Sequence, residues 1–325
     1  MAAPADLTVV VLSWNTRALT LRALAAVPAA CAPFVARVVC VDNASADGSA
    51  DAVAAEHPEV VLVRNAENLG FARGNAAALP HVEGRAVVFL NSDTEAQPGA
   101  LAHVLRYLDA HEGVGVASPP LVGTDGAPQR AVWGFPTAAS LLHQYTPLAW
   151  LHVGRRASRR QRDEGFAATT GPVDAVAGAA MVVRRDVLER LRGFDPGYPF
   201  YVEDVDLCWR AARAGAAVHF VGDGPAVVHH GGASASIAGG ETRLPLLQGI
   251  LRFQRKRMRP AAYAAFAVAF KTGVVARSLW EIVRTPVAAA ARAARGRTER
   301  ARRTLDVARA RVHFLERDLR AFLRA

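Results

Sequence analysis

The chain has 325 residues and a net charge of +10, from 39 Lys and Arg against 29 Asp and Glu. Residues 1–242 carry 19 basic and 24 acidic side chains, whereas residues 243–325 carry 20 and 5, so the positive charge belongs to the C-terminal part. An apolar content of 51% excludes a disordered protein, and three scattered cysteines argue against a disulfide framework or a zinc cluster. We expect a domain at 1–242 and an Arg-rich helical region at 243–325, in a reducing, cytoplasmic compartment.

Short β-branched runs alternate with helical stretches over the first 120 residues. Buried strands are expected at 7–12, 37–42, 60–64 and 86–90, and helices at 17–27, 46–56, 71–79 and 98–110. This alternation predicts an α/β fold, with a Rossmann-like, mostly parallel sheet and helices on both faces. Ligands of such a sheet bind beyond the carboxyl ends of the strands, so the residues that follow each strand are candidates for a site.

Polar residues follow the first two strands. Ser13-Trp14-Asn15 ends the first strand, and Asp42-Asn43-Ala44-Ser45 ends the second. The Asp42 carboxylate at that edge could accept hydrogen bonds from a nucleotide base or a ribose. The alternative is structural, because Asp and Asn often begin turns and cap helices.

After the third strand, the segment 64–75 (RNAENLGFARGN) contains a glycine-flanked turn that opens a helix. Backbone N–H groups at that helix start, with Arg73 nearby, could face an anionic diphosphate. No G-x-G-x-x-G follows the first strand and no G-x-x-x-x-G-K-[ST] loop occurs. A hydride-transfer enzyme and a kinase are therefore disfavoured.

The fourth strand runs directly into Asn91-Ser92-Asp93. A carboxylate beside an amide suits a hard divalent cation that is held mainly by substrate phosphates and water. Such a cation would offset the negative charge that develops on a leaving diphosphate. A simple turn is the alternative for these three residues.

Residues 119–172 are rich in Pro, Gly, Thr and Arg and include five arginines at 155–162. Regular patterning returns at 173–184. Further on we expect a helix at 204–214 and strands at 218–221 and 226–229.

Three carboxylates, Glu203, Asp204 and Asp206, lie at the start of the helix expected at 204–214. Asp206 precedes Arg210 by four residues, a spacing at which the two side chains pair, so we assign both a scaffold role. Glu203 and Asp204 remain as candidates for acid or base catalysis on an acceptor hydroxyl.

Adjacent histidines, His229 and His230, end the last expected strand. Side chains alternate along a strand, so only one of the two can readily face a given site. One imidazole could complete a metal site with Asp93. The alternative is a hydrogen-bonded structural histidine.

The C-terminal region has helical periodicity. Leu305, Ala308, Val312, Leu315, Leu319 and Phe322 form a heptad seam, for which packing within the chain, homo-oligomerisation and membrane-surface contact are the alternatives. The most membrane-like stretch, 261–283, contains Lys271, Arg277 and Glu281, so we expect the protein not to span a membrane.

Seven motifs occur in a fixed order over residues 7–236: VVVLSWN, VVCVDNASADGS, NLGFARGN, VVFLNSDTE, VDAVAGAAMVVRR, GFDPGYPFYVEDVDLCWR and VVHHGGAS. Together they resemble the family 2 glycosyltransferases, inverting enzymes of GT-A fold. The resemblance is strongest to the rhamnosyltransferase-like branch that builds bacterial cell-wall and surface polysaccharides.

The resemblance implies a role for particular residues. Those beside the nucleotide and the donor would be Asn15, Asp42, Asn68, Gly70, Arg73 and Asn75. Asn91-Ser92-Asp93 matches the family's D-x-D position with Asn in place of the first carboxylate, so Asp93 would hold a divalent metal (Mg or Mn), with His229 near it. Gly178 and Ala179 would approach the sugars closely. Asp204 matches the general base, and Glu203 would orient it or bind an acceptor hydroxyl.

The resemblance further implies transfer of a sugar from a nucleotide-diphosphate donor, with dTDP-rhamnose favoured over a UDP-sugar. The acceptor would be a glycan or a polyprenyl-diphosphate-linked glycan. The basic tail would then hold the enzyme at the anionic inner face of the cell membrane. Two other classes compete: a non-catalytic scaffold subunit, and a nucleic-acid-binding protein that uses the tail, although the acidic body would repel a nucleic acid.

Overall fold

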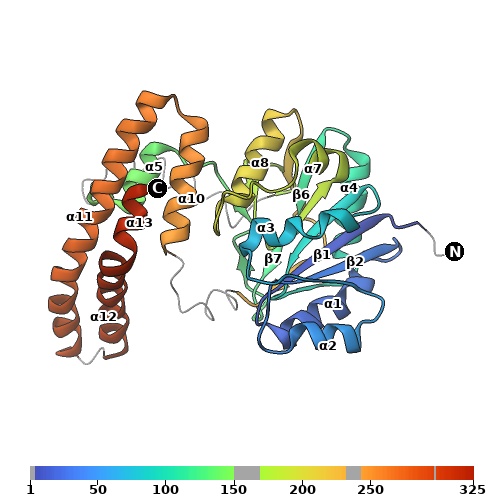
Figure 1. Cartoon of the computed structure of the whole chain (residues 1–325), viewed down its shortest axis with the longest axis horizontal. Coiled ribbons are helices and arrows are strands. Elements are labelled where there is room, and N and C mark those ends of the chain that lie inside the picture. Colours follow the sequence, from blue (N-terminus) through green and yellow to red (C-terminus); the bar gives the residue numbers. More distant parts are fainter. Residues whose placement is uncertain (1–3, 150–168, 232–242, 296–297) are drawn as a thin grey trace. The chain divides into compact units, whose positions relative to one another are not determined.

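The computed structural model describes residues 4–149, 169–231, 243–295 and 298–325, and it contains two compact units (Figure 1). The first comprises Met1–Phe135 and Arg162–Thr242, and the second Pro136–Gln161 and Arg243–Ala325. Residues 136–149, which lie inside the first expected domain, therefore group with the C-terminal helices. The division at 242/243 into separate domains stays a prediction.

The first unit is built on an eight-stranded sheet of order β10-β13-β6-β12-β4-β1-β2-β3. Its strands are β1 (Leu7–Ser13), β2 (Ala36–Asp42), β3 (Val61–Arg64), β4 (Ala86–Asn91), β6 (Val114–Ser118), β10 (Gly171–Pro172), β12 (Ala180–Arg184) and β13 (Ala217–Phe220). β1 pairs in parallel with both β2 and β4, whereas β12 runs antiparallel to β4 and β6. The predicted α/β class with a mostly parallel sheet is confirmed.

Strand register brings three chain segments to one edge of this sheet. Ser13 lies opposite Asp42, and Leu12 lies opposite Asn91, so β1, β2 and β4 end side by side. The strands themselves are apolar and buried because both faces of the sheet are covered. The polar residues that follow them are therefore held on a rigid support.

Helices flank the sheet. They are α1 (Arg17–Cys31), α2 (Ser49–Glu56), α3 (Gly70–Ala76), α4 (Ala100–Ala110), α7 (Arg185–Leu191) and α8 (Glu203–Arg213), with a 3-10 turn, η1 (Leu79–His81). α1 and α2 lie on one side of the sheet, and α3 and α8 lie on the other (Figure 1). The helices and strands predicted over the first 120 residues are all present, with ends that differ by a few residues.

Two small sheets complete the first unit. One has the order β5-β14-β7-β8, with β5 (Thr94–Ala96), β7 (Leu121–Val122), β8 (Pro128–Gln129) and β14 (Val227–His229); the other pairs β9 (Val132–Trp133) with β11 (Ala175–Val176). The pattern expected at 173–184 is divided into β11 and β12, with Ala177, Gly178 and Ala179 between them. β14 pairs with β5, which brings the two histidines beside the segment after β4.

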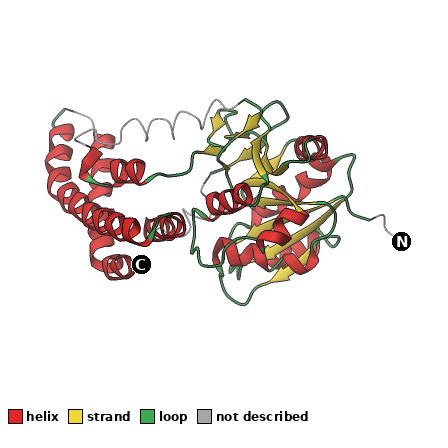
Figure 2. Cartoon of the chain, turned by 90° about the horizontal axis from the view of Figure 1, so that it is seen from above, coloured by secondary structure: helices red, strands yellow, loops and turns green. Residues whose placement is uncertain are grey.

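The second unit is helical (Figure 2). It comprises α5 (Ala138–Tyr145), a 3-10 turn η2 (Pro147–Ala149), α10 (Arg243–Arg257), α11 (Pro260–Ala293), α12 (Thr298–His313), the π-helical turn η3 (Phe314–Asp318) and α13 (Leu319–Arg324). No helix in the described ranges is long and apolar enough to cross a membrane. The arginines at 155–162 lie outside the described residues.

The heptad seam of the C-terminal segment does not form one continuous buried face. The π-helical turn changes the phase of the helix, so Phe314 and Phe322 are fully buried, while Leu305 and Val312 remain partly exposed. Leu305 and Val312 line an open groove together with Ile282 and Pro286 of α11. Packing within the chain therefore accounts for part of the seam.

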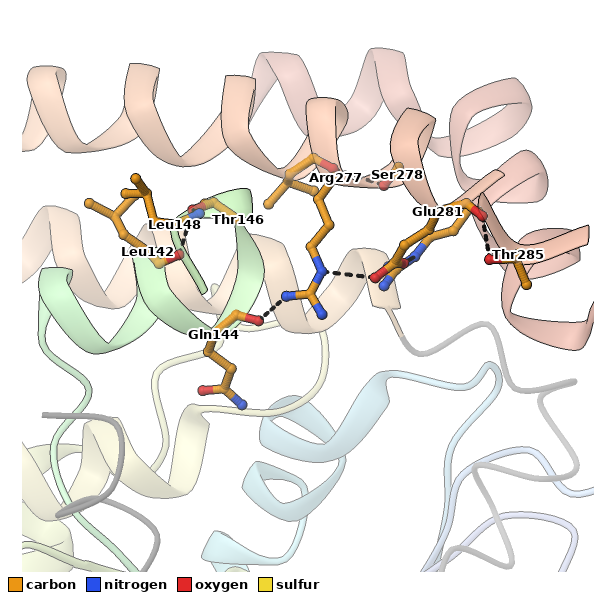
Figure 3. A network of polar contacts seen from close by, with 10 residues as sticks. Leu142, Gln144, Thr146, Leu148, Arg277, Ser278, Glu281 and Thr285 are labelled. Carbon is orange, nitrogen blue, oxygen red and sulfur yellow. Dashed lines mark hydrogen bonds and ion pairs between the residues drawn. The ribbon is translucent and has the colours of Figure 1, made fainter. Parts of the chain in front are cut away.

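A buried ionic network joins α11 to α5 and α12 (Figure 3). Arg277 Nε donates to Glu281 Oε1 at 2.9 Å, and Arg311 Nε donates to Glu281 Oε2. A second guanidinium nitrogen of Arg277 donates to the Gln144 carbonyl. Glu281 and Arg311 are 8% and 7% exposed, so the network fixes the register of the three helices in a poorly solvated interior.

Candidate functional site

The loops that follow β1 and β2 are tied together by Asn15. Its side-chain oxygen accepts a hydrogen bond from the Ala46 N–H at 2.7 Å, and its own N–H donates to Ser45 Oγ at 2.9 Å. Asn15 has a φ of +54°, a conformation that Asn tolerates better than most residues. In this structure, the Asn15 amide positions the loop around the predicted nucleotide site.

Asp42 combines a structural and an unsatisfied oxygen. Oδ2 accepts a hydrogen bond from the Ser45 N–H at 3.0 Å. This contact begins a turn, as the structural alternative for Asp42 predicted. Oδ1 is buried and has no hydrogen-bond partner among the described residues. A buried acceptor without a partner is costly, so Oδ1 is suited to a donor group of a ligand, such as the N–H of a base.

Asn43 organises the segment between β3 and α3, a role that was not predicted for it. Its Oδ1 accepts from Asn65 Nδ2 at 3.0 Å and from the Leu69 N–H at 3.1 Å, while its Nδ2 donates to Asn68 Oδ1 at 2.8 Å. The predicted donor residue Asn68 is thus part of a network of side-chain amides. This network sets the start of α3.

The remaining predicted donor residues differ in their surroundings. Gly70 has a φ of +74°, and a Cβ there would lie 2.7 Å from the Pro199 carbonyl oxygen, so α3 adjoins the loop before α8. Asn75 is buried and donates to the Phe71 carbonyl at 3.0 Å, a scaffold contact. Arg73 is exposed, as a residue that meets an anionic ligand requires.

Asp93 and His229 come together at the end of β4. His229 Nε2 lies 3.5 Å from Asp93 Oδ1, and Asp93 is 5% exposed. His230 points elsewhere, because its Nε2 lies 2.7 Å from Glu95 Oε1. Of the two adjacent histidines, His229 is the one that faces the carboxylate.

Gln129 on β8 determines how His229 presents its ring. The Gln129 Nε2 donates to the His229 carbonyl at 2.8 Å, which leaves Oε1 to contact His229 Nδ1 at 2.8 Å. A carbonyl only accepts, so the amide orientation is fixed and Nδ1 must carry the proton. In the neutral ring, Nε2 then has a free lone pair directed to the side of Asp93, which is the arrangement found behind metal-binding histidines.

These groups fit a divalent cation that a substrate helps to hold. Within the described residues, no group of three or more His, Cys, Asp or Glu side chains is arranged to hold a metal ion; Asp93 and His229 would supply one oxygen and one nitrogen. Mg²⁺ and Mn²⁺ at phosphate sites commonly use few protein ligands and take the rest from phosphates and water.

Asn91 and Ser92 act in this structure through contacts that hold the loop. The Asn91 N–H donates to the Ala179 carbonyl at 3.0 Å, and Ser92 Oγ lies 2.7 Å from Thr16 Oγ1. The Ala179 contact joins the end of β4 to the segment before β12. Asp93, two residues after Asn91, and Gly178, next to Ala179, are therefore held near each other by this backbone hydrogen bond.

Gly178 in turn contacts the carboxylate at the start of α8. Its N–H donates to Asp204 Oδ2 at 3.0 Å, and the Val205 N–H donates to Asp204 Oδ1 at 2.8 Å. A Cβ on Gly178 would lie 3.4 Å from Asp204 Cβ and from the Phe71 ring of α3. The absence of a side chain at Gly178 thus leaves space between α3 and Asp204.

Glu203 and Asp204 have different environments. Burial, together with the neighbouring Asp204 charge, raises the pKa of Glu203 to about 8. Glu203 Oε2 is buried without a described partner. Burial also raises the pKa of Asp204, but two backbone N–H bonds oppose that effect. At neutral pH, we therefore expect Asp204 to hold the negative charge and Glu203 to hold a proton.

The start of α8 is held by a strained turn and a buried ion pair. Tyr201 and Val202 have φ values of +68° and +72°, a conformation that is unfavourable for a β-branched residue. Arg210 Nε donates to Asp206 Oδ2 at 2.7 Å, and Tyr198 donates to Asp206 Oδ1 at 3.0 Å. The predicted scaffold pair Asp206–Arg210 is confirmed.

Comparisons with known proteins identify the family of the chain. The family described as "Glycosyltransferase like family 2" matches residues 4–236. An N-acetylglucosaminyl-diphospho-decaprenol L-rhamnosyltransferase of Mycobacterium tuberculosis is 27% identical over 190 residues, which cover 55% of this chain and 61% of that protein. The rhamnosyltransferase WbbL of Escherichia coli is 49% identical over 49 residues, or 15% of this chain and 19% of that protein. The chain thus matches less than two thirds of the length of these relatives.

Solved structures of similar fold contain nucleotides and manganese. A mannosyltransferase from Pyrobaculum calidifontis, in complex with GDP-Man and Mn2+, has a TM-score of 0.54 and 22% identity, covering 99% of this chain and 84% of that one. GalNAc-T7 with UDP, GalNAc and Mn2+ has a TM-score of 0.50 and 15% identity, covering 70% of this chain and 44% of that one. At these identities the likeness concerns the fold.

Proposed function

Since the chain belongs to the glycosyltransferase-like family 2 and is a glycosyltransferase of GT-A fold, we propose that it moves a sugar from a nucleoside-diphosphate donor to an acceptor hydroxyl with inversion at the anomeric carbon. The observation that carries the proposal is the position of the Asp204 carboxylate, whose Oδ2 accepts a hydrogen bond from the Gly178 N–H at 3.0 Å. Because Gly178 has no side chain, we infer that sugars can approach the carboxylate there. One carboxylate acting as a base on the acceptor requires no covalent intermediate.

In the proposed reaction, Asp204 takes the proton of the acceptor hydroxyl as that oxygen attacks the anomeric carbon. Two backbone N–H groups hold the Asp204 carboxylate in place, and protonated Glu203 beside it is suited to hydrogen-bond an acceptor hydroxyl. The unpaired Asp42 Oδ1 would accept a hydrogen bond from the base of the donor. Arg73 would contribute positive charge near the departing diphosphate.

Asp93 and His229 would hold a divalent cation, Mg or Mn, which when bound supplies positive charge to the diphosphate leaving group. Support comes from the 3.5 Å approach of the two side chains and from Gln129, which directs the free nitrogen of His229 to that side. Structures of similar fold were solved with Mn2+.

The names of two relatives support a rhamnose donor and a lipid-linked acceptor. Both are rhamnosyltransferases, and one acts on N-acetylglucosaminyl-diphospho-decaprenol by its name. We therefore propose dTDP-rhamnose as donor and a polyprenyl-diphosphate-linked glycan as acceptor. Such an acceptor lies in a membrane, so the enzyme would work peripherally at the inner face of the cell membrane.

A thermal-shift screen of nucleotide sugars, with and without Mn²⁺ or Mg²⁺, tests the donor proposal, because a bound donor stabilises the fold by mass action. We expect dTDP-rhamnose with a metal to raise Tm more than UDP- or GDP-sugars do. An Asp93→Asn variant should lose the metal-dependent part of the shift. Product from the stabilising donor should have the anomeric configuration opposite to that of the donor in an NMR spectrum; retention would contradict the proposed displacement.

A further inference from the structure

The solvent face of α11 is apolar along almost its whole length. Fifteen residues between 261 and 290 are exposed, and all except Thr272 and Arg284 are Ala, Val, Leu, Trp or Pro. The larger ones are strongly exposed: Val283 is 70%, Val287 71%, Leu279 53% and Trp280 49% exposed. A helix whose inner and outer faces are both apolar is unusual at the surface of a water-soluble domain.

The inner face of α11 already has its partners. Phe266, Phe270, Val274, Ser278, Glu281, Thr285 and Ala289 are buried, at spacings of four and three residues. These residues face α5 and α12. The polar contacts of Arg277 and Glu281 join α11 to the same two helices (Figure 3). Leu279, Val283 and Val287 lie about 120–200° around the helix from this buried row, so packing within the helical unit does not require them to be apolar.

Basic residues bracket this apolar face. Arg255, Lys256 and Arg259 precede α11, Arg292 lies in its last turn, and Arg295 follows it. Residues 243–325 as a whole carry 20 basic and 5 acidic side chains. The 34-residue helix is about 50 Å long, so positive charge lies at both ends of an extended apolar surface.

We propose that the outer face of α11, defined by Val268, Leu279, Trp280, Val283 and Val287, lies on an anionic lipid bilayer, parallel to the membrane plane. The partner is identified by charge complementarity, because apolar side chains enter the acyl region while the flanking basic groups meet acidic headgroups. A second copy of this chain would instead bring two strongly positive surfaces together. This inference rests on the proposed membrane location and names the surface responsible for it.

Co-sedimentation of the full-length protein with vesicles tests the proposal. Wild type should bind vesicles of phosphatidylglycerol and phosphatidylcholine, bind pure phosphatidylcholine much less, and lose affinity as salt rises. The double variant Val283→Ser/Val287→Ser should reduce binding to the anionic vesicles about tenfold or more. The matched control Val35→Ser, at a 44% exposed valine of the first unit, should leave binding unchanged.

Two further readouts separate the outcomes. Trp280→Phe should remove most of the fluorescence quenching caused by lipids brominated in the acyl chain, which only an inserted Trp280 would give. Transfer to a water-soluble acceptor should be unaffected by the Val283/Val287 variant, so a failure of the sugar chemistry would be distinguished from a failure of membrane binding. Unchanged vesicle binding by the double variant would overturn the proposal, and so would a wild-type dimer that the double variant converts to a monomer.

Discussion

Glu203 and Asp204, two neighbouring carboxyl groups at the start of α8, are expected to differ in protonation state because their surroundings differ. Asp204 accepts two backbone N–H bonds, whereas Glu203 Oε2 is buried without a described partner. The folded state raises the pKa of Glu203 from its ordinary 4.5 to about 8, so the native protein binds the extra proton. Between about pH 4.5 and about pH 8 the unfolded chain loses this proton while the folded protein keeps it, so the free energy of unfolding falls as pH rises through that range.

Glu203→Gln tests this assignment because Gln resembles the protonated acid. We expect wild-type kcat/KM to fall as pH passes about 8, where Glu203 becomes charged beside Asp204, and Glu203→Gln to keep near-normal activity with that alkaline decline removed. The Tm of the variant should exceed that of wild type by more at pH 9 than at pH 6. A pH profile that Glu203→Gln does not change would show that Glu203 is not the group that titrates.

Gln129 fixes the ring of His229, and its removal should weaken metal binding without removing a metal ligand. We expect Gln129→Leu to lower Mn²⁺ affinity in the presence of nucleoside diphosphate by about 10–100-fold, because the His229 ring loses the partner of Nδ1. Electron paramagnetic resonance of free Mn²⁺ measures this affinity directly. His230→Gln is the control, since His230 contacts Glu95 and should leave the affinity unchanged.

The polar residues that follow the strands can be recognised in the sequence, but the side-chain amides that support them cannot. Asp42, Asp93 and Asp204 follow strands or open a helix, so their places were visible in the chain. Gln129 acts from a two-residue strand that is 100 residues away from His229 in the sequence, and no local pattern marks it. For Asp42, the structural alternative is confirmed by the turn contact of one oxygen, and ligand binding by the unpaired oxygen stays a prediction.

At the scale of elements, the start of α3 depends on a close approach to the loop before α8. Gly70 and Gly99 both have left-handed φ values, +74° and +77°, but a Cβ on Gly70 would lie 2.7 Å from the Pro199 carbonyl, whereas a Cβ on Gly99 meets nothing within 4 Å. The pair therefore separates backbone strain from steric conflict.

Replacing each glycine by Ala should cost about 1–2 kcal/mol for the left-handed backbone. Gly70→Ala should cost about 1–3 kcal/mol more, because the Pro199 segment must move. Urea unfolding measures the difference in the free energy of unfolding. We also expect Gly70→Ala, but not Gly99→Ala, to weaken donor binding; equal costs for the two variants would contradict the close approach.

The strands of three or more residues that were predicted have ends within one residue of those observed, whereas the two-residue strands were not predicted individually. Runs such as β1 and β4 are continuous apolar segments bounded by polar residues, so their pattern alone specifies a buried strand. β7, β8, β9 and β11 have two residues each, and their pairing depends on contacts distant in the sequence. The π-helical turn at Phe314–Asp318 also escaped detection, because the heptad spacing continues through it.

At the scale of the whole molecule, the helical unit relies on a buried carboxylate between two guanidinium groups. Glu281→Ala should destabilise it by about 3–5 kcal/mol, because the buried Arg311 and the partly buried Arg277 would lose their counterion. The double change Glu281→Met/Arg311→Met should recover much of that loss. Chemical unfolding measures both, and Glu316→Ala, at an exposed position of the same unit, is the control with little expected effect.

The net charge of +10 divides between parts with different proposed roles. The region that matches the glycosyltransferase family has more acidic than basic residues and contains the proposed metal and base carboxylates. The C-terminal region has the large positive excess and the exposed apolar face of α11. Chemistry and membrane contact can therefore be changed by separate substitutions.

The most direct test of the central claim is to measure transfer and donor affinity together in Asp204→Asn. Asn keeps the shape of the side chain but cannot take the acceptor proton. We predict that kcat for transfer from dTDP-rhamnose falls by about 10²–10⁴-fold, while the Kd of the donor with Mn²⁺ changes less than about twofold. Transfer by Asp204→Asn at a rate near that of wild type would contradict the assignment of Asp204 as the base of an inverting glycosyltransferase.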